Sequence, residues 1–195
     1  TKLQAQLEIS SHYGKMYRIK YGAAKTKVTV VGSEIDQNYF IDVKPWIMDN
    51  EVVKVVTDND HLGQIVSGRN QEDKNVDLRL EKGRKNLYSF LGAGFSYKCL
   101  LSPVLKLHIY RTFTCPIARS WLSSFALRSA KLEPLSLFQR KTLKSILKLS
   151  LTAPTPAIHF LTGELPIEGM VHGDIFSVFY SILAKPDSKF YEVVK

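Results

Sequence analysis

The sequence predicts an α+β fold, in which a small antiparallel hairpin region is followed by a mostly helical bundle. The strand signals are short β-branched runs, confined to residues 27–66. From Gln71 onward, the apolar residues recur with the period of a helix. With 195 residues, 45% of them hydrophobic, the chain can bury a core as one large domain or two small ones.

The first part of the chain carries one helix and three strand signals. Apolar side chains predict a helix from Leu3 to about Tyr17. Residues 27–31 (KVTVV) are β-branched and predict a strand, and two more strands are predicted at 52–56 and 62–66. The residues between the last two, Thr57-Asp58-Asn59-Asp60, favour a turn. These two strands should therefore pair as a hairpin.

The helical part begins with a helix from Gln71 to Gly92 or Gly94, with Gly83 on its apolar side, where a neighbour could approach closely. Ser102-Pro103 is typical of a helix start, with Ser as N-cap and Pro at the first helical position. Pro116 should kink or end that helix, and more helix is expected through residues 121–127.

Three further helices complete the bundle. Residues 135–149 alternate between an apolar and a basic face, and Thr155-Pro156 and Pro166 each predict another helix start. Gly163 should end the first of these, and the last should run to about Leu183. Gly169 and Gly173 lie one turn apart and predict tight packing of that last helix. We expect four phenylalanines in the core: Phe138, Phe160, Phe176 and Phe179.

The predicted domains are residues 1–70, residues 71–183 and a flexible tail, 184–195. The chain begins without Met or a signal sequence, so we expect a fragment of a longer protein. Cys99 and Cys115 lack metal-ligand spacing and should be reduced thiols of an intracellular protein. The five histidines are scattered, no phosphate-binding glycine loop is present, and no apolar run approaches the length of a membrane span. The sequence therefore predicts no metal site and no membrane partner.

Positive charge is concentrated in residues 102–150. This stretch has nine basic side chains and one acid, Glu133, so it supplies +8 of the net charge of +9. A local field of one sign costs self-repulsion, which a polyanion would relieve. Nucleic acid is the first candidate, because each phosphate contact releases counterions. The basic residues are Lys106, Arg111, Arg119, Arg128, Lys131, Arg140, Lys141, Lys144 and Lys148.

Four of these cations share one face of the amphipathic helix at 135–149. Arg140, Lys141, Lys144 and Lys148 fall within an arc of about 100°. The alternative is an ordinary solvated face, but surface helices usually mix charges of both signs. We therefore expect this face to contact phosphates.

Several motifs occur in a recognisable order. Leu3-Gln4-Ala5-Gln6-Leu7 is followed by Gly22-Ala23-Ala24-Lys25-Thr26, His61-Leu62-Gly63, Cys115-Pro116-Ile117, the run LSLFQRKTLKSIL at 135–147, and GELPIE at 163–168. This order resembles the region after the catalytic carboxylates in reverse transcriptases of non-LTR retrotransposons, over roughly residues 3–183. Gly22 departs from the family pattern, which has Asn there.

The resemblance implies the last part of the polymerase palm and the thumb. The catalytic aspartates would lie upstream, so we expect no polymerase activity from this chain alone and no cofactor bound by it, with Mg²⁺ required by the full-length enzyme. RNA and DNA would be its partners, together with the upstream palm and fingers of the same polyprotein. The expected location is intracellular, in the nucleus or cytoplasm.

The resemblance also implies roles for single residues. Lys25, and with it Lys27, would lie near the phosphates of the incoming nucleotide, although solvated lysines are the alternative. His61, Leu62 and Gly63 would set the primer strand, the alternative being a hairpin entry with a buried Leu62. Among the aromatic residues, Tyr110 beside Arg111 is the best candidate for stacking on a base.

Two other functions remain open at this stage. The chain could be a degenerate retroelement relic that acts as a helical protein-interaction module, which the Gly22 substitution fits. It could also be an unrelated basic nucleic-acid-binding protein, which the order of the motifs argues against. Asp58 and Asp60 form a compact acidic pair, and we expect them to serve the turn and not a metal.

Overall fold

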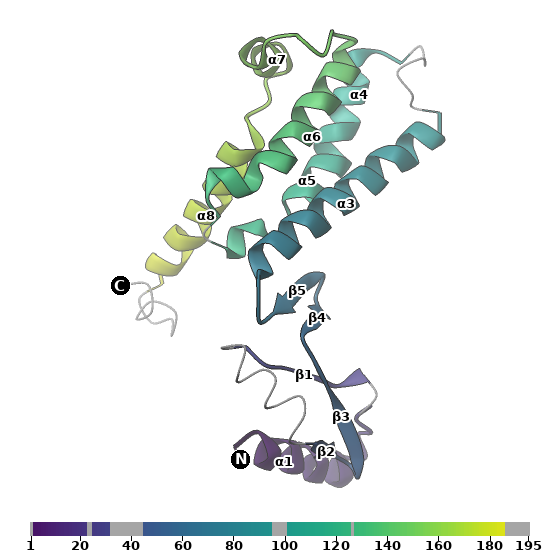
Figure 1. The fold of residues 1–195 in the computed structure, drawn as a ribbon, viewed down its shortest axis with the longest axis vertical. Coiled ribbons are helices and arrows are strands. Elements are labelled where there is room, and N and C mark those ends of the chain that lie inside the picture. Colours follow the sequence, from purple (N-terminus) through teal and green to yellow (C-terminus); the bar gives the residue numbers. More distant parts are fainter. Residues whose placement is uncertain (1, 23–24, 32–44, 95–100, 126, 186–195) are drawn as a thin grey trace. The chain divides into compact units, whose positions relative to one another are not determined.

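The computed structural model describes residues 2–22, 25–31, 45–94, 101–125 and 127–185 (Figure 1). The chain divides into two compact units, Thr1–Gln71 and Glu72–Lys195. Among the described residues, the first contains one helix and short strands, and the second contains helices. The predicted α+β class is therefore confirmed. The tail expected at 184–195 lies largely outside the described residues, as does Cys99.

The first unit packs a helix on a small mixed sheet. Strand β3 lies in the middle, parallel to β1 on one side and antiparallel to β2 on the other. Trp46, Met48 and Val53 form the buried core on one face of the sheet, and Leu3 and Leu7 of the helix pack against it. The elements are α1 (Lys2–Tyr17), β1 (Lys27–Thr29), β2 (Trp46–Met48) and β3 (Glu51–Val56).

The predicted hairpin paired the wrong strands. The predicted strand at 52–56 is β3, which pairs with β1 and β2, and residues expected to turn instead form β4 (Asp58–His61), which pairs with β5 (Gln64–Ser67). The turn lies at Leu62-Gly63, whose φ angles of 49° and 81° match the two-residue turns that favour hairpins. Ser67 Oγ donates to the Asp58 carboxylate across the pair, so the polar run is held as a strand.

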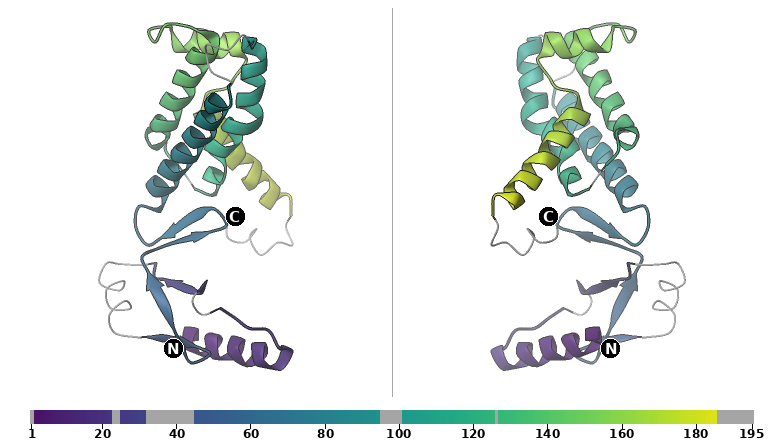
Figure 2. Two further views of the ribbon diagram at one scale, coloured as in Figure 1. Left: turned by 90° about the vertical axis from the view of Figure 1, so that its right-hand side faces the viewer. Right: turned by 90° about the vertical axis from the view of Figure 1, so that its left-hand side faces the viewer.

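The second unit consists of helices joined by short connections (Figures 1 and 2). One of them contains a π-helical turn, η2, and one connection contains a 3₁₀ turn, η3. In order they are α3 (Gln71–Gly92), α4 (Pro103–Ile109), η2 (Tyr110–Thr114), α5 (Cys115–Arg119), η3 (Leu122–Ser124), α6 (Ser129–Leu147), α7 (Thr155–Thr162) and α8 (Ile167–Leu183).

Most of the predicted helix boundaries are confirmed. Ser102 caps α4 by accepting a hydrogen bond from the Leu105 amide, and Gly163 ends α7 with a φ of 65°. Pro116 was expected to kink or end its helix. The π turn η2 interrupts the regular α-helix directly before Pro116, and the chain continues as α5 to Arg119. One prediction needs correction. Trp121 adopts a φ of 66°, so the helix expected at 121–127 is reduced to the 3₁₀ turn.

The core of the second unit gathers side chains from α3, α5, α6 and α8. Gly83 of α3 faces α5 and α6 there, and a Cβ atom added to it would lie 3.2 Å from Ala118 Cβ and 3.4 Å from Phe138 Cε1. The close approach predicted at Gly83 is thus confirmed. The same expectation was wrong for Gly169 and Gly173, where an added Cβ would have no described neighbour within 4 Å.

The predicted burial of the phenylalanines holds only for Phe138, on the inward side of α6. Phe160 is 88% exposed on α7, Phe176 is 73% exposed on α8, and Phe179 is also exposed. Position on an apolar helix was therefore a poor guide to burial here. Helix α8 has more apolar surface than the other described helices of the unit cover.

We predict that Gly83→Leu lowers the free energy of unfolding of the helical unit by about 1–3 kcal/mol, because the added side chain must displace Ala118 and Phe138. Gly173→Leu is the matched control, since its site is open and leucine is the better helix former. Denaturant titration followed by circular dichroism measures both. Equal effects at the two positions would contradict the packing described for Gly83.

Candidate nucleic-acid interface

The basic stretch is partly neutralised by acids that lie far away in the sequence. Within the described residues, at least four of its nine cations form ion pairs with carboxylates. The partners come from the start of α3, from α6 itself, from the connection after α7 and from α8. The pairs are Arg111–Glu164, Arg119–Asp174 (3.3 Å), Lys131 with Glu72 (2.8 Å) and Asp73 (3.0 Å), and Arg140–Glu133 (2.6 Å).

The pair between Arg140 and Glu133 corrects the view of α6 as a purely basic face. Glu133 lies seven residues before Arg140, which is two turns of helix, and so it shares that face. Lys106, another of the nine, is buried in α4 and is not presented to a ligand. The charge of the stretch is therefore smaller at the surface than its sequence indicates.

Three lysines at the C-terminal end of α6 remain available. Lys141 and Lys148 are exposed, and Lys144 Nζ donates to the carbonyl of Leu151 in the next connection. None of the three has an acidic partner among the residues described. Lys148 ends the helix in the left-handed conformation, with a φ of 55°. This group, Lys141, Lys144 and Lys148, is called the α6 lysine cluster below.

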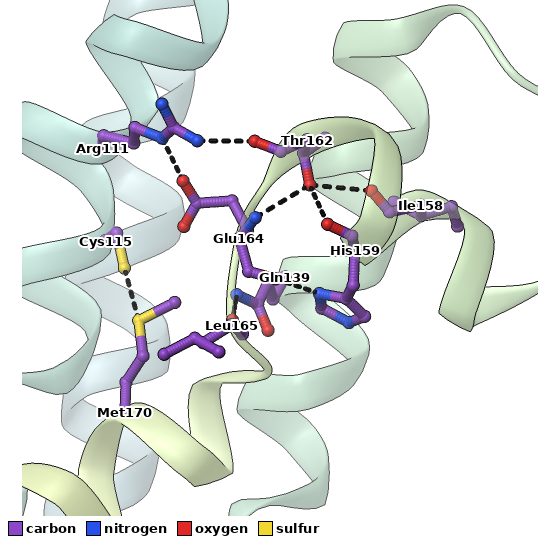
Figure 3. Close-up of polar contacts among 9 residues, drawn as sticks. All are labelled: Arg111, Cys115, Gln139, Ile158, His159, Thr162, Glu164, Leu165 and Met170. Atoms are coloured by element: carbon purple, nitrogen blue, oxygen red, sulfur yellow. Dashed lines mark hydrogen bonds and ion pairs between the residues drawn. The ribbon is translucent and has the colours of Figure 1, made fainter.

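Arg111 serves the fold and does not project freely. Its Nε donates to the carboxylate of Glu164, and its Nη2 donates to the carbonyl of Thr162 at the end of α7 (Figure 3). The Thr162 hydroxyl accepts a hydrogen bond from the Glu164 amide, which fixes the same bend. Tyr110 is only 1% exposed, so the predicted stacking of a base on it is wrong.

Gln139 of α6 clamps the connection between α7 and α8. Its Nε2 donates to the carbonyl of Leu165 (2.9 Å), and its Oε1 accepts from the amide of Ile167 (2.7 Å). Gln139 lies beside Leu165 (Figure 3). His159 Nδ1 lies 2.9 Å from the carbonyl oxygen of Glu164. Two motifs that are distant in the sequence, at 135–147 and 163–168, are thus one structural unit.

Tyr110 and Cys115 are buried titratable groups that lie near Gln139. Burial raises the pKa of the Tyr110 hydroxyl and of the Cys115 thiol, so both stay protonated at neutral pH. The Tyr110 hydroxyl lies beside Cys115 and Gln139 without a hydrogen bond of normal geometry to a described residue. Cys115 Sγ contacts Met170 Sδ at 3.7 Å. In the described ranges, no three His, Cys, Asp or Glu side chains gather as a metal site would need.

The first unit holds the other predicted site residues. Lys25 and Lys27 are exposed, just before and at the start of β1. His61 ends β4, and Leu62 and Gly63 form the tip of the β4–β5 hairpin. Leu62 is 73% exposed there, so the alternative of a buried leucine is wrong. The sequence predicted these residues at the start of a strand. In the structure His61 ends β4, and Leu62 and Gly63 form the turn between β4 and β5.

We predict that Gln139→Leu destabilises the helical unit by about 2–4 kcal/mol, because it leaves a buried amide and a carbonyl without their partner. Ser136→Ala on the same helix is the control. It removes a hydrogen bond to the Glu168 side chain and should cost about 1 kcal/mol or less. Denaturant titration measures both, and a Gln139 effect no larger than that of Ser136 would argue against the clamp.

In the described part of the chain, no helix is both long and apolar enough to cross a bilayer. A scan against models of protein families found no match, and searches of curated proteins and of solved structures found no similar protein.

Proposed function

We propose that this chain is the end of the palm and the thumb of a reverse transcriptase of the non-LTR retrotransposon type. In this role it holds the backbones of template RNA and primer DNA and has no polymerase activity of its own. Residues 1–71 correspond to the partial palm, and the helical unit corresponds to the thumb. The α6 lysine cluster is the observation that carries the proposal.

The cations of the basic stretch differ in whether a carboxylate lies beside them. Arg111, Arg119, Lys131 and Arg140 have carboxylate partners, whereas the α6 lysine cluster has none among the described residues. Phosphates are the natural partners for such lysines, because binding them releases counterions. Lysine contacts to phosphates fix position and read no sequence, which suits a protein that must hold any template.

The end of a helix offers a second reason for lysines at this place. Cations near a helix C-terminus interact favourably with the unpaired carbonyls, by about 0.3–1 kcal/mol each. This effect would contribute to stability and would leave nucleic-acid binding unaffected. The two roles therefore separate in experiment, since only phosphate binding changes the dependence of affinity on salt.

The β4–β5 hairpin tip supports the same function. Leu62 and Gly63 project from the hairpin with little covering from described residues. Gly63 has no side chain, so a nucleic-acid strand could approach the backbone closely at the tip. His61 is exposed beside it and can donate to a phosphate or sugar oxygen.

A second candidate function is a helical protein-interaction module. The observation that favours it is the apolar surface of α7 and α8, where Phe160, Phe176 and Tyr180 are all more than 70% exposed. Exposed apolar patches of this kind often mark protein interfaces. A chain of this second type would bind nucleic acid weakly and without dependence on the α6 lysine cluster.

We predict that changing Lys141, Lys144 and Lys148 together to Ala weakens binding of an RNA–DNA hybrid equally for unrelated sequences. The slope of log affinity against log salt should flatten by about 2–3 units, since about three phosphate contacts are lost. Fluorescence anisotropy over a range of salt concentrations measures the slope.

The matched control changes Lys82, Arg84 and Lys85 to Ala. These residues lie on α3 of the same unit, so the variant loses the same net charge. It should keep the slope of the unchanged chain to within about one unit. If the two triple variants flatten the slope equally, or neither does, the α6 lysine cluster is not the phosphate-binding surface.

A further inference from the structure

Lys27 and Lys54 lie side by side on the face of the three-stranded sheet that the described residues leave open. Strands β1 and β3 run parallel, with Lys27 opposite Lys54 and Val28 opposite Val55. The two valines pack against the buried core of the unit. Since successive side chains of a strand point to opposite faces, the two lysines share the other face. Both are exposed.

Such a pair is unfavourable for the sheet by itself. Like charges directly opposite one another on neighbouring strands destabilise a sheet. Among the residues described, neither lysine forms an ion pair that would relieve the repulsion. An anion between the two ammonium groups would turn this repulsion into attraction on both sides.

The surroundings of the pair match a nucleic-acid strand better than a free ion. Ile47 and Val52 are opposite each other on β2 and β3 and are exposed, at 45% and 67%. Val52 is two residues before Lys54, so it lies on the same face. Cations beside a small apolar surface suit a ligand that alternates phosphates with sugars.

We propose that Lys27 and Lys54 together bind one phosphate of a nucleic-acid backbone lying across the open face of this sheet. The inference deepens the proposed function and rests on it. Lys54 is the new residue, since nothing in its sequence neighbourhood marks it. Only the parallel register of β1 and β3 brings it beside Lys27.

The test uses Lys54→Glu in the full chain. This change replaces a repulsive pair by an attractive one, so the first unit should unfold at higher denaturant concentration. The same change should weaken binding of an RNA–DNA hybrid by about tenfold at low salt and flatten the salt slope by about 1–2 units. A variant that raises stability and weakens binding would identify the lysine pair as a ligand site.

Lys20→Glu is the matched control, with the same charge change in the same unit. Lys20 is exposed and lies outside the sheet, so its variant should alter both measurements less. Lys54→Ala and Lys27→Ala should each flatten the slope by about one unit, and the double variant by less than the sum, since both contact one phosphate.

The outcomes separate this inference from the proposed function. If the hybrid binds and the variants of the α6 lysine cluster weaken it, but Lys54→Glu binds as the unchanged chain does, the pair is not a phosphate site. If Lys54→Glu weakens binding no more than Lys20→Glu, the pair is likewise excluded. Repeating the titration with a nucleoside triphosphate distinguishes the source of the phosphate. Binding of the triphosphate alone, lost in Lys54→Glu, would keep a phosphate site and overturn the assignment to a nucleic-acid backbone.

Discussion

Carboxylates supplied by the fold determine which cations of this protein can meet a ligand. Residues 102–150 contain one acid, yet the helical unit brings Glu72, Asp73, Glu164 and Asp174 against their basic side chains. Surface ion pairs of this kind contribute little to stability, about 0–1 kcal/mol. Under the proposed function their effect on binding is larger, because they occupy cations that a polyanion could otherwise contact. The basic side chains that a polyanion could contact are thereby reduced to a few positions.

The polar network around Gln139 and Arg111 links the formation of these ion pairs to the packing of the helices. Gln139 holds the connection between α7 and α8, and Arg111 is drawn to Glu164 in that same connection. These contacts use side chains on the inner side of α6 and on η2. The C-terminal end of α6 lies outside this network, and its three lysines have no carboxylate partner among the described residues. Under the proposed function, the polar network and the phosphate-binding lysines therefore use different parts of one helix.

Local sequence signals predicted local structure well, and contacts between distant segments poorly. Ser102-Pro103, Gly163 and Pro166 set helix ends through their own backbone geometry, so their neighbours in sequence suffice. The partners of strand 51–56 could not be predicted, because a three-residue strand such as β2 has too weak a sequence pattern. The turn was misplaced because Asp58-Asn59-Asp60 favours a turn as strongly as Leu62-Gly63, where the chain does turn. Burial of Tyr110 and exposure of Phe176 likewise depend on which helix faces lack a neighbour. For the same reason, the sequence could not predict the ion pair of Arg111 or the pairing of Lys27 with Lys54.

Under the proposed function, nucleic acid is bound by specific lysines and not by the net charge of the chain. Acetylation rates of individual lysines, measured by mass spectrometry with and without a bound RNA–DNA hybrid, test this directly. The account predicts slower acetylation on binding at Lys27, Lys54, Lys141, Lys144 and Lys148, and unchanged rates at Lys82, Lys85 and Lys131. Uniform protection of all lysines, or protection confined to those of α3, would contradict it.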